Sequence, residues 1–374
     1  MKKIKTLIAV LLVLVLAVPA GVNAAAYDDD DYYDSYDDPW DYDDTWEEEP
    51  DPDMSGVTLT PISSTVFYEG DEYTQAAYTM KVRINSPAYV FNDFSYIESV
   101  DSTNNSFYCD VEDVKNNILT LSIEPYYYMG EAASTNIYIT INEKKFPAIP
   151  VTVQRISLNK SSLLLSKGKT AKLSVRCGGK AFSGKTEWCS LNKKIVSISN
   201  TGKIKAKKEG NAVVYAKVNG HRVGCAVSVT SKKKCAAINT AKKIVKTGKY
   251  SQKKRMQKKY YDCSSLVWKA YRKNGCNFGN KNWAPTAAEQ AKYMTKKHKM
   301  LGKISWKKVD KMYYRAGDVC YKVGEPNGRY KNVYHAEMVA GYDFCYFDQK
   351  GKPVVTLLPV RGSFYGDKHL MARP

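Results

Sequence analysis

Apolar and polar residues alternate along most of residues 56–230, and helical spacing replaces this pattern from about Ala236. A period of two puts successive side chains on opposite faces of a strand, whereas spacings of three and four put them on one face of a helix. The alternating part predicts two antiparallel β-sandwiches, over residues 55–154 and 155–230. The strands expected in the first are 57–59, 78–84, 118–123, 137–141 and 149–153.

The pattern changes from helices to strands within residues 231–374. A helix is expected from about Ala236 to a stop at Gly248, a second helix from Cys263, and a third after Pro285. The strands expected after them are 319–323, 333–341, 345–347 and 354–360. Helices followed by an antiparallel sheet predict an α+β domain.

The first 54 residues differ from the rest in composition. Residues 1–24 have the lysines, short apolar run and small-residue cleavage site of a secretory signal peptide. No later segment reaches membrane-span length, so we expect an exported mature chain without a transmembrane segment. Residues 25–54 are rich in Tyr and Asp and carry no base, which predicts a disordered acidic linker. Alternatively, this tail folds back onto the basic C-terminal half and screens its charge.

The formal net charge of +19 is distributed unevenly along the chain. Residues 156–374 hold 48 basic and 11 acidic residues, a formal charge of +37. Such a field in an exported protein predicts an anionic partner, and peptidoglycan with the anionic polymers of a bacterial wall fits best. A nucleic-acid partner is not expected, because no helix-turn-helix, finger or ribonucleoprotein motif is present. Alternatively, the lysines only keep the surface soluble.

The nine cysteines are an odd number, so at least one is free even if the others pair. Cys177, Cys189 and Cys225 lie together in residues 155–230, where one disulfide is possible and its partners stay open. No pair has C-x-x-C spacing and only four histidines occur, so we expect no structural metal site and no cofactor.

The segment 260–268 contains a candidate nucleophile. Asp262 can cap a helix, which places Cys263 in the first helical turn. Unpaired N–H groups and the helix dipole favour a negative charge there, and a thiolate is the nucleophilic form of cysteine. The alternative, which spacing alone favours, is an inert half-buried cysteine on an amphipathic helix.

A cysteine nucleophile needs a base, usually a histidine. His298 lies among lysines and is expected to be solvated, and His369 lies in a polar segment near residue 374. His335 instead lies on an expected strand, after another strand introduced by Gly317 and Asp318. The order of cysteine helix, Gly-Asp strand start and histidine strand makes His335 the candidate base.

Two stretches of the chain resemble known families. The first comprises ISLNKSSLLLSKGKTAKLSV from Ile156, TEWCS at 186–190, IVSISNTGKIKAKKEGNAVVYAKV at 195–218 and CAVSV at 225–229. It resembles the bacterial Ig-like domain of the second type, with Trp188 as its core aromatic residue and a turn at 200–202. The resemblance implies a presenting or adhesive module without chemistry of its own.

The second comprises YDCSSLVW at 261–268, WAPTAAEQ at 283–290, AGDVCY at 316–321 and YHAEMVAGY at 334–342. These motifs, spanning about residues 236–361, resemble the NlpC-type cell-wall cysteine peptidases. The resemblance implies a papain-like α+β fold over residues 231–374, with Cys263 as nucleophile and His335 as general base and acid. It also implies that Tyr250 hydrogen-bonds the oxyanion and that Asp262 and Ser264 line substrate subsites.

Two features depart from this family. Its third polar residue lies on the strand after the histidine, where this chain offers Thr356, whose hydroxyl is a poor partner for orienting an imidazole. Glu337 shares a face with His335 but is expected to be poorly placed to orient it, so the third role stays unassigned. The second departure is an expanded loop, 343–352, expected to reshape the cleft.

The leading hypothesis is therefore an exported peptidoglycan hydrolase. It would cleave an amide of the stem peptide, typically between D-glutamate and a diamino acid, by a Cys–His mechanism without a cofactor. One alternative is a wall-binding or adhesive surface protein with a catalytically silent C-terminal domain. A second is an amidase or acyltransferase on the same scaffold.

Overall fold

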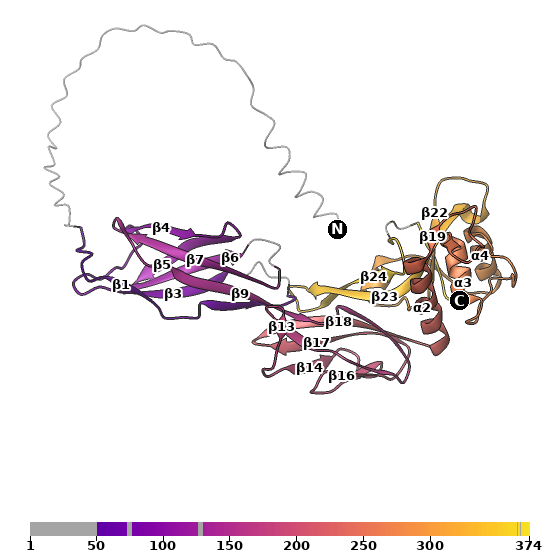
Figure 1. Ribbon diagram of the computed structural model, residues 1–374, viewed down its shortest axis with the longest axis horizontal. Coiled ribbons are helices and arrows are strands. Elements are labelled where there is room, and N and C mark those ends of the chain that lie inside the picture. The colour runs from indigo at the N-terminus through magenta and orange to yellow at the C-terminus, as the bar shows by residue number, and fades with distance from the viewer. Residues whose placement is uncertain (1–50, 73–76, 126–129, 365, 367) are drawn as a thin grey trace, which may run out of the picture. The chain divides into compact units, whose positions relative to one another are not determined.

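The computed structural model describes residues 51–72, 77–125, 130–364, 366 and 368–374 (Figure 1). The expected signal peptide, 1–24, and nearly all of the acidic segment, 25–54, lie outside the described residues, so both stay predictions. Within the described ranges, none of the helices is both long and apolar enough to cross a membrane.

Two sheets enclose the core of the first sandwich. Strand β3 illustrates why it forms: Met80, Val82 and Ile84 are buried, and the residues between them are exposed. The first sheet has the order β1 (Thr58–Pro61), β3 (Tyr78–Asn85), β6 (Ile118–Pro125), β5 (Phe107–Lys115). The second contains β4 (Ile97–Ser102), β7 (Ala132–Ile141) and β9 (Ile149–Leu158), with β2 (Val66–Glu69) on β9 and β8 (Lys144–Lys145) on β7.

Strand β9 runs through the sequence position at which the two sandwiches were expected to separate, between residues 154 and 155. Its first part pairs with β7, and its last part, Ile156–Leu158, pairs with β12 (Val175–Cys177). Strand β12 in turn pairs with β13 (Lys180–Ala181). The alternation does not stop at residue 154, because Ile156 is fully buried in the next core. The two sandwiches therefore share a strand.

The second sandwich consists of two further sheets. One has the order β10 (Ser162–Ser166), β18 (His221–Thr230), β17 (Gly210–Val218), β14 (Glu187–Ser190), and the other β11 (Thr170–Lys172), β16 (Lys203–Ala206), β15 (Val196–Ile198). Trp188 is half-buried between two apolar clusters. Gly202 closes the expected turn with φ +78°, and a Cβ there would lie 2.5 Å from the carbonyl oxygen of Leu173. All nine cysteines are described and none forms a disulfide.

The C-terminal domain begins with helices and ends in a five-stranded antiparallel sheet. One core joins α2, α3 and α4 to the middle of this sheet. The helices are α2 (Lys232–Thr247), α3 (Cys263–Tyr271), α4 (Ala287–Lys296), α5 (Trp306–Asp310) and the 3₁₀ turn η1 (Tyr330–Asn332). The sheet order is β21 (Met300–Lys303), β25 (Leu370–Ala372), β22 (Val319–Val323), β23 (Val333–Phe347), β24 (Pro353–Pro359), and β19 (Lys249–Tyr250) pairs separately with β20 (Tyr260–Tyr261).

Asp318 fastens the last strand to this sheet. Its buried carboxylate accepts hydrogen bonds from Nε and Nη2 of Arg373 at 2.8 and 2.7 Å. It also accepts the backbone N–H of Arg315 at 2.9 Å. Such a two-pronged pair is among the strong charge-assisted hydrogen bonds. The Gly-Asp sequence before β22 therefore fixes β25 beside β22 within the sheet.

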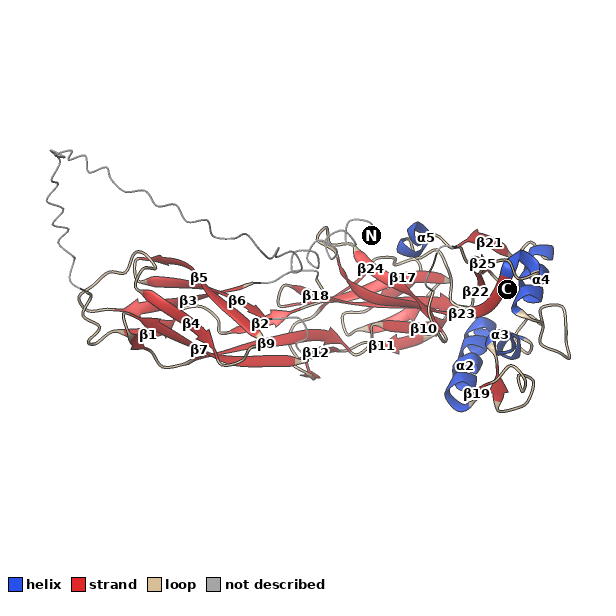
Figure 2. Ribbon diagram, turned by 90° about the horizontal axis from the view of Figure 1, so that it is seen from above, coloured by secondary structure: helices blue, strands red, loops and turns tan. Residues whose placement is uncertain are grey.

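Strands β23 and β24 form a long hairpin that packs against β18 of the second sandwich (Figure 2). Phe344 and Phe347 are buried there, in a cluster that also holds Val213 and Ala226 of the sandwich. The expected loop at 343–352 is shorter in the structure, because residues 343–347 continue β23, including the expected strand 345–347, and only residues 348–352 form the turn. Gly224 makes the approach possible, since a Cβ at this position would lie 2.5 Å from the ring of Phe344.

We expect Phe347→Ala to lower the free energy of unfolding by about 3–5 kcal/mol, because it empties a buried aromatic site. The substitution also removes the ring that lies 4.4 Å from the guanidinium carbon of Arg222. Urea denaturation followed by tryptophan fluorescence measures the effect. Lys350→Ala, in the exposed turn of the same hairpin, serves as control and should change stability by less than about 0.5 kcal/mol. Equal effects of the two substitutions would contradict the packing of the hairpin.

Candidate active site

The start of helix α3 is fixed by a capping box. The Asp262 carboxylate accepts the backbone N–H of Ser265 at 2.7 Å, and the Ser265 hydroxyl accepts the backbone N–H of Asp262 at 2.9 Å. Asp262 is therefore the N-cap, and Cys263 is the first residue of the helix. The thiol thus lies where unpaired N–H groups favour a negative charge.

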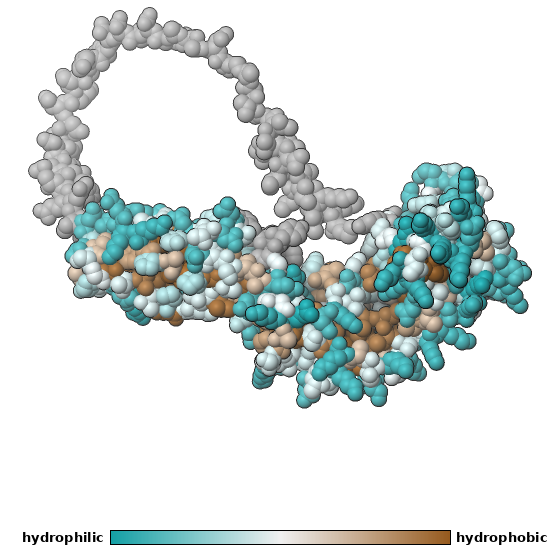
Figure 3. Space-filling view, in the orientation of Figure 1, coloured by the Kyte–Doolittle hydropathy of each residue, from teal (hydrophilic) through white to brown (hydrophobic). Residues whose placement is uncertain are grey.

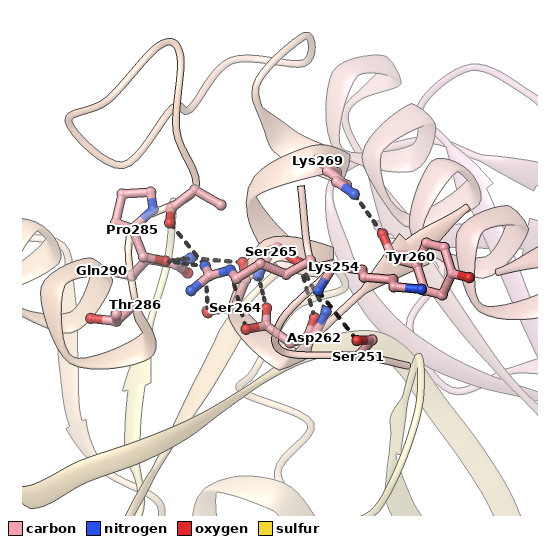
Figure 4. A network of polar contacts seen from close by, with 12 residues as sticks. Ser251, Lys254, Tyr260, Asp262, Ser264, Ser265, Lys269, Pro285, Thr286 and Gln290 are labelled. Carbon is pink, nitrogen blue, oxygen red and sulfur yellow. Dashed lines mark hydrogen bonds and ion pairs between the residues drawn. The ribbon is translucent and has the colours of Figure 1, made fainter. Parts of the chain in front are cut away.

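Arg255 braces this helix start from outside. Its Nε lies 3.2 Å from the Asp262 carboxylate, and its Nη2 donates to the Ser264 hydroxyl at 3.0 Å. The same Nη2 donates to the carbonyl of Ala284 at 2.9 Å. Gln290, fully buried, donates to the carbonyl of Ser264 at 2.8 Å. Figure 4 shows Asp262, Ser264 and Gln290 gathered in this network, so the WAPTAAEQ segment supports the cysteine helix.

Asp262 and Ser264 were expected to line substrate subsites. The structure leaves them 5% and 3% exposed, and neither lines the cavity at Cys263. Both instead use their polar atoms within the capping and bracing network. Their observed role is to position the residue between them.

The imidazole of His335, on β23, lies beside the Cys263 thiol, and both side chains line one cavity. Burial alone would raise the pKa of Cys263, but the His335 hydrogen bond and charge outweigh it, and the pKa lies below its usual value. The backbone N–H of Ala336 also donates to the sulfur. Burial would lower the pKa of His335, but hydrogen bonds to Cys263 and Glu337 raise it to about 9. Both shifts favour the thiolate–imidazolium form of the pair over the neutral form.

Glu337 contacts the other side of this pair. Its Oε1 lies 3.5 Å from His335 Nε2, and its Oε2 lies 3.4 Å from Lys322 Nζ. The backbone N–H of Ser363 donates to Oε1 at 3.3 Å. The expectation that Glu337 is poorly placed is thus wrong: side chains two apart on one strand reach each other here. The Glu337 carboxylate thus lies beside the imidazole and stabilises its charged form.

Thr356 does not reach this group. It is exposed on β24 and pairs with Asp343, eight residues along β23 from His335. At about 3.3 Å per residue, this separation is roughly 26 Å along the strand. Of the other histidines considered, His298 is exposed with φ +52° and His369 is buried, and neither lines the cavity.

Tyr250 is brought to Cys263 by the pairing of β19 with β20, which places it beside Tyr261. Its hydroxyl is within hydrogen-bonding reach of both the backbone N–H and the thiol of Cys263. Burial and the neighbouring Cys263 charge raise the pKa of Tyr250, so its phenol stays protonated and can donate. The Cys263 N–H and the Tyr250 hydroxyl thus lie next to each other at the sulfur, where an oxyanion site would need its donors.

These residues border a cavity of about 260 Å³. Its lining consists of Tyr250, Tyr261, Cys263, Leu266, His335, Ala336, Glu337, Met338, Val360, Arg361 and Gly362. None of residues 343–352 takes part, so the hairpin does not shape this cleft. Hollows of about 360 and 420 Å³ in and between the sandwiches have no cysteine or histidine in their lining. Within the described ranges, no three His, Cys, Asp or Glu side chains converge as metal ligands.

Sequence reasoning missed three residues of this site. Arg255 was indistinguishable from the lysines around it, and Arg361 lies beyond the expected last strand. Lys322 shares a cross-strand pair with His335, which becomes visible only when the register of β22 and β23 is known.

Comparison with known proteins identifies one domain. The family profile described as bacterial Ig-like domain (group 2) matches residues 152–237. Residues 152–237 are a bacterial Ig-like domain of group 2. This confirms the first resemblance, and the profile ends before the cysteine helix. The site around Cys263 therefore rests on its own geometry.

Other known proteins are more distantly similar to parts of this chain. An S-layer-related protein of Niallia circulans is 32% identical over 96 residues, which is 24% of this chain and 6% of that protein. Domains 4 and 5 of the S-layer protein SbsC are 18% identical with a TM-score of 0.18, covering 47% of this chain and 98% of that one. Invasin, a bacterial integrin-binding protein, is 11% identical with a TM-score of 0.29, covering 48% and 40%.

The Ig-like domain is joined to the cysteine domain by polar contacts as well as by the hairpin. Its Asn211 donates to the carbonyl oxygens of Met312 and Tyr314 at 2.8 and 2.7 Å. Ser228 accepts the backbone N–H of Tyr342 at 3.2 Å. The Ser228 bond holds β23 seven residues beyond His335, and the Asn211 bonds hold the segment 312–314 that precedes β22.

We expect His335→Ala to slow alkylation of Cys263 by iodoacetamide at pH 7 about ten-fold or more. Without the imidazolium, burial raises the thiol pKa, and each unit removes about nine-tenths of the thiolate. Mass spectrometry of the peptide that contains Cys263 measures the rate. His298→Asn is the matched control, since asparagine tolerates its left-handed backbone and the site is remote. Equal slowing in the control would contradict a His335-specific effect.

We expect Glu337→Gln to lower the pKa of His335 below its value of about 9, because the carboxylate stabilises the imidazolium. The imidazolium would then be lost at a lower pH as pH rises. An NMR titration of the His335 ring measures the shift. Glu325→Gln, at an exposed loop position, should leave the titration unchanged. An unaltered pKa in Glu337→Gln would exclude the orienting role.

Proposed function

We propose that this protein is a bacterial surface protein whose residues 231–374 form an NlpC-like, papain-like cysteine peptidase domain acting on peptidoglycan stem peptides. The observation that carries the proposal is that Cys263, at a helix start, lines one cavity together with His335 and Tyr250. Nucleophile, base and oxyanion donors border one cavity, which is the arrangement that acyl transfer requires.

The chemistry follows from the charge state of the pair. The Cys263 thiolate attacks the carbonyl carbon of an amide, forming a C–S bond and an oxyanion near the Tyr250 hydroxyl and the Cys263 N–H. Collapse of this intermediate breaks the C–N bond, and the His335 imidazolium gives its proton to the leaving nitrogen. Water then attacks the thioester while neutral His335 takes its proton, which releases a carboxylic acid and restores the thiolate.

A wall substrate is supported by charge and by the neighbouring domain. The lysine-rich C-terminal part is covered largely by hydrophilic residues on the face seen in Figure 3. Such a surface attracts anionic polymers at low ionic strength. The Ig-like domain would hold the catalytic domain at the cell surface, and the similarity of part of the chain to an S-layer-related protein supports such a location.

The comparisons give stronger support to a second candidate, a surface or wall-binding protein without catalysis. Both the group 2 Ig-like profile and the S-layer-related relative concern this kind of protein and not an enzyme. In that case the cysteine domain would bind wall material without cleaving it. An amidase or acyltransferase on the same scaffold would use the same thiolate, and the masses of its products would differ.

We expect Cys263→Ala to reduce release of fragments from purified peptidoglycan at least about a thousandfold, because it removes the nucleophile. Mass spectrometry of soluble muropeptides identifies which bond has gained water, most typically D-glutamyl–diamino acid. Cys345→Ala removes an exposed thiol outside the cavity and should leave the rate unchanged. Fragment release by Cys263→Ala at the wild-type rate would refute the assignment. Binding of intact peptidoglycan without cleavage by the wild type would establish the second candidate.

A further inference from the structure

Arg361 lies at the mouth of the cavity, in the segment that follows β24. Its guanidinium carbon is 4.6 Å from the ring centre of Tyr250 and 5.4 Å from that of Tyr261. Cation–π contacts of this kind restrict the long side chain while leaving the in-plane N–H donors available. The side chain is exposed and lines the cavity.

The charge of Arg361 has no anionic partner among the residues that the structure describes. The carboxylate nearest in the lining is Glu337, and it is engaged by His335, Lys322 and the backbone of Ser363. The Cys263 thiolate is likewise matched by His335. Arg361 is thus the permanently charged cation of the cavity lining, oriented but not neutralised.

We infer that Arg361 binds a carboxylate of the substrate next to the scissile amide. A guanidinium fork matches a carboxylate through two parallel hydrogen bonds, and a stacked fork loses little freedom on binding. Tyr250 touches both Arg361 and Cys263, so a carboxylate on the fork lies one tyrosine away from the sulfur. The inference rests on the proposed function, which supplies peptide substrates with such a group.

The stem peptide offers two sources of a carboxylate: the free α-carboxylate of the γ-linked D-glutamate and the carboxylate at the peptide's C-terminus. Three synthetic peptides of the sequence L-alanyl-γ-D-glutamyl-L-lysine separate them. One carries both carboxylates, one has the D-glutamate α-carboxylate amidated, and one has the C-terminus amidated. Calorimetry with Cys263→Ala protein measures binding without turnover.

We expect amidation of the anchoring carboxylate to weaken binding about five- to ten-fold, a value at the low end for charged hydrogen bonds because Arg361 is exposed. Adding Arg361→Gln should bring the ratio close to one. Adding Arg329→Gln, at an exposed site outside the cavity, should leave the ratio intact. Tyr250→Phe, which keeps the stacking ring, should also preserve it.

A loss of affinity on either amidation, abolished by Arg361→Gln, supports the inference and names the carboxylate. Equal affinity for all three peptides, absence of binding to any of them, or a preference that survives Arg361→Gln would overturn it. Carboxylate-dependent binding without cleavage by the wild-type protein would overturn the proposed peptidase function and leave the binding site standing. Cleavage by the wild-type protein without a preference for the free carboxylate would overturn the inference about Arg361 and leave the proposed peptidase function standing.

Discussion

The Asp262 carboxylate is the group on which the arrangement around Cys263 depends. It is buried at the start of α3, where it receives the backbone N–H of Ser265 and pairs with Arg255. An unpaired carboxylate at that depth would be costly, so the capping box and the guanidinium must form together. The capping box and the Arg255 contact together fix the start of α3, and Cys263 is the first residue of this helix.

The position of His335 also depends on contacts made elsewhere in the structure. His335 lies on a strand whose distal half is anchored to the Ig-like domain through Phe344 and Phe347. The strand cannot slide without withdrawing two buried rings from their site. The position of the imidazole is therefore fixed by packing far from the cavity, and Glu337 then fixes its orientation.

Short sequence patterns predicted the helices and strands around the site, but they did not predict the contacts between residues far apart in the chain. Asp262 as N-cap, the helix stop at Gly248 and strand β22 follow from short patterns, and the structure has each of them. The strands β21 and β25 were not foreseen, because strands of three or four residues are too short to show a clear alternation. The charged residues Arg255 and Lys322 contribute to the site through carboxylates in other elements, Asp262 and Glu337. No spacing rule reveals such partners before the register is known.

Strand β9 has a consequence for how the two sandwiches behave as folding units. Because residues 149–158 contribute to both, the backbone ladder of one continues into the other in place of a hinge. Unfolding of either sandwich would remove hydrogen-bond partners from the shared strand. The two sandwiches are therefore expected to unfold as one cooperative unit. Dividing the chain between residues 154 and 155 would cut a strand and leave each half with unpaired backbone groups at a sheet edge, which favours aggregation.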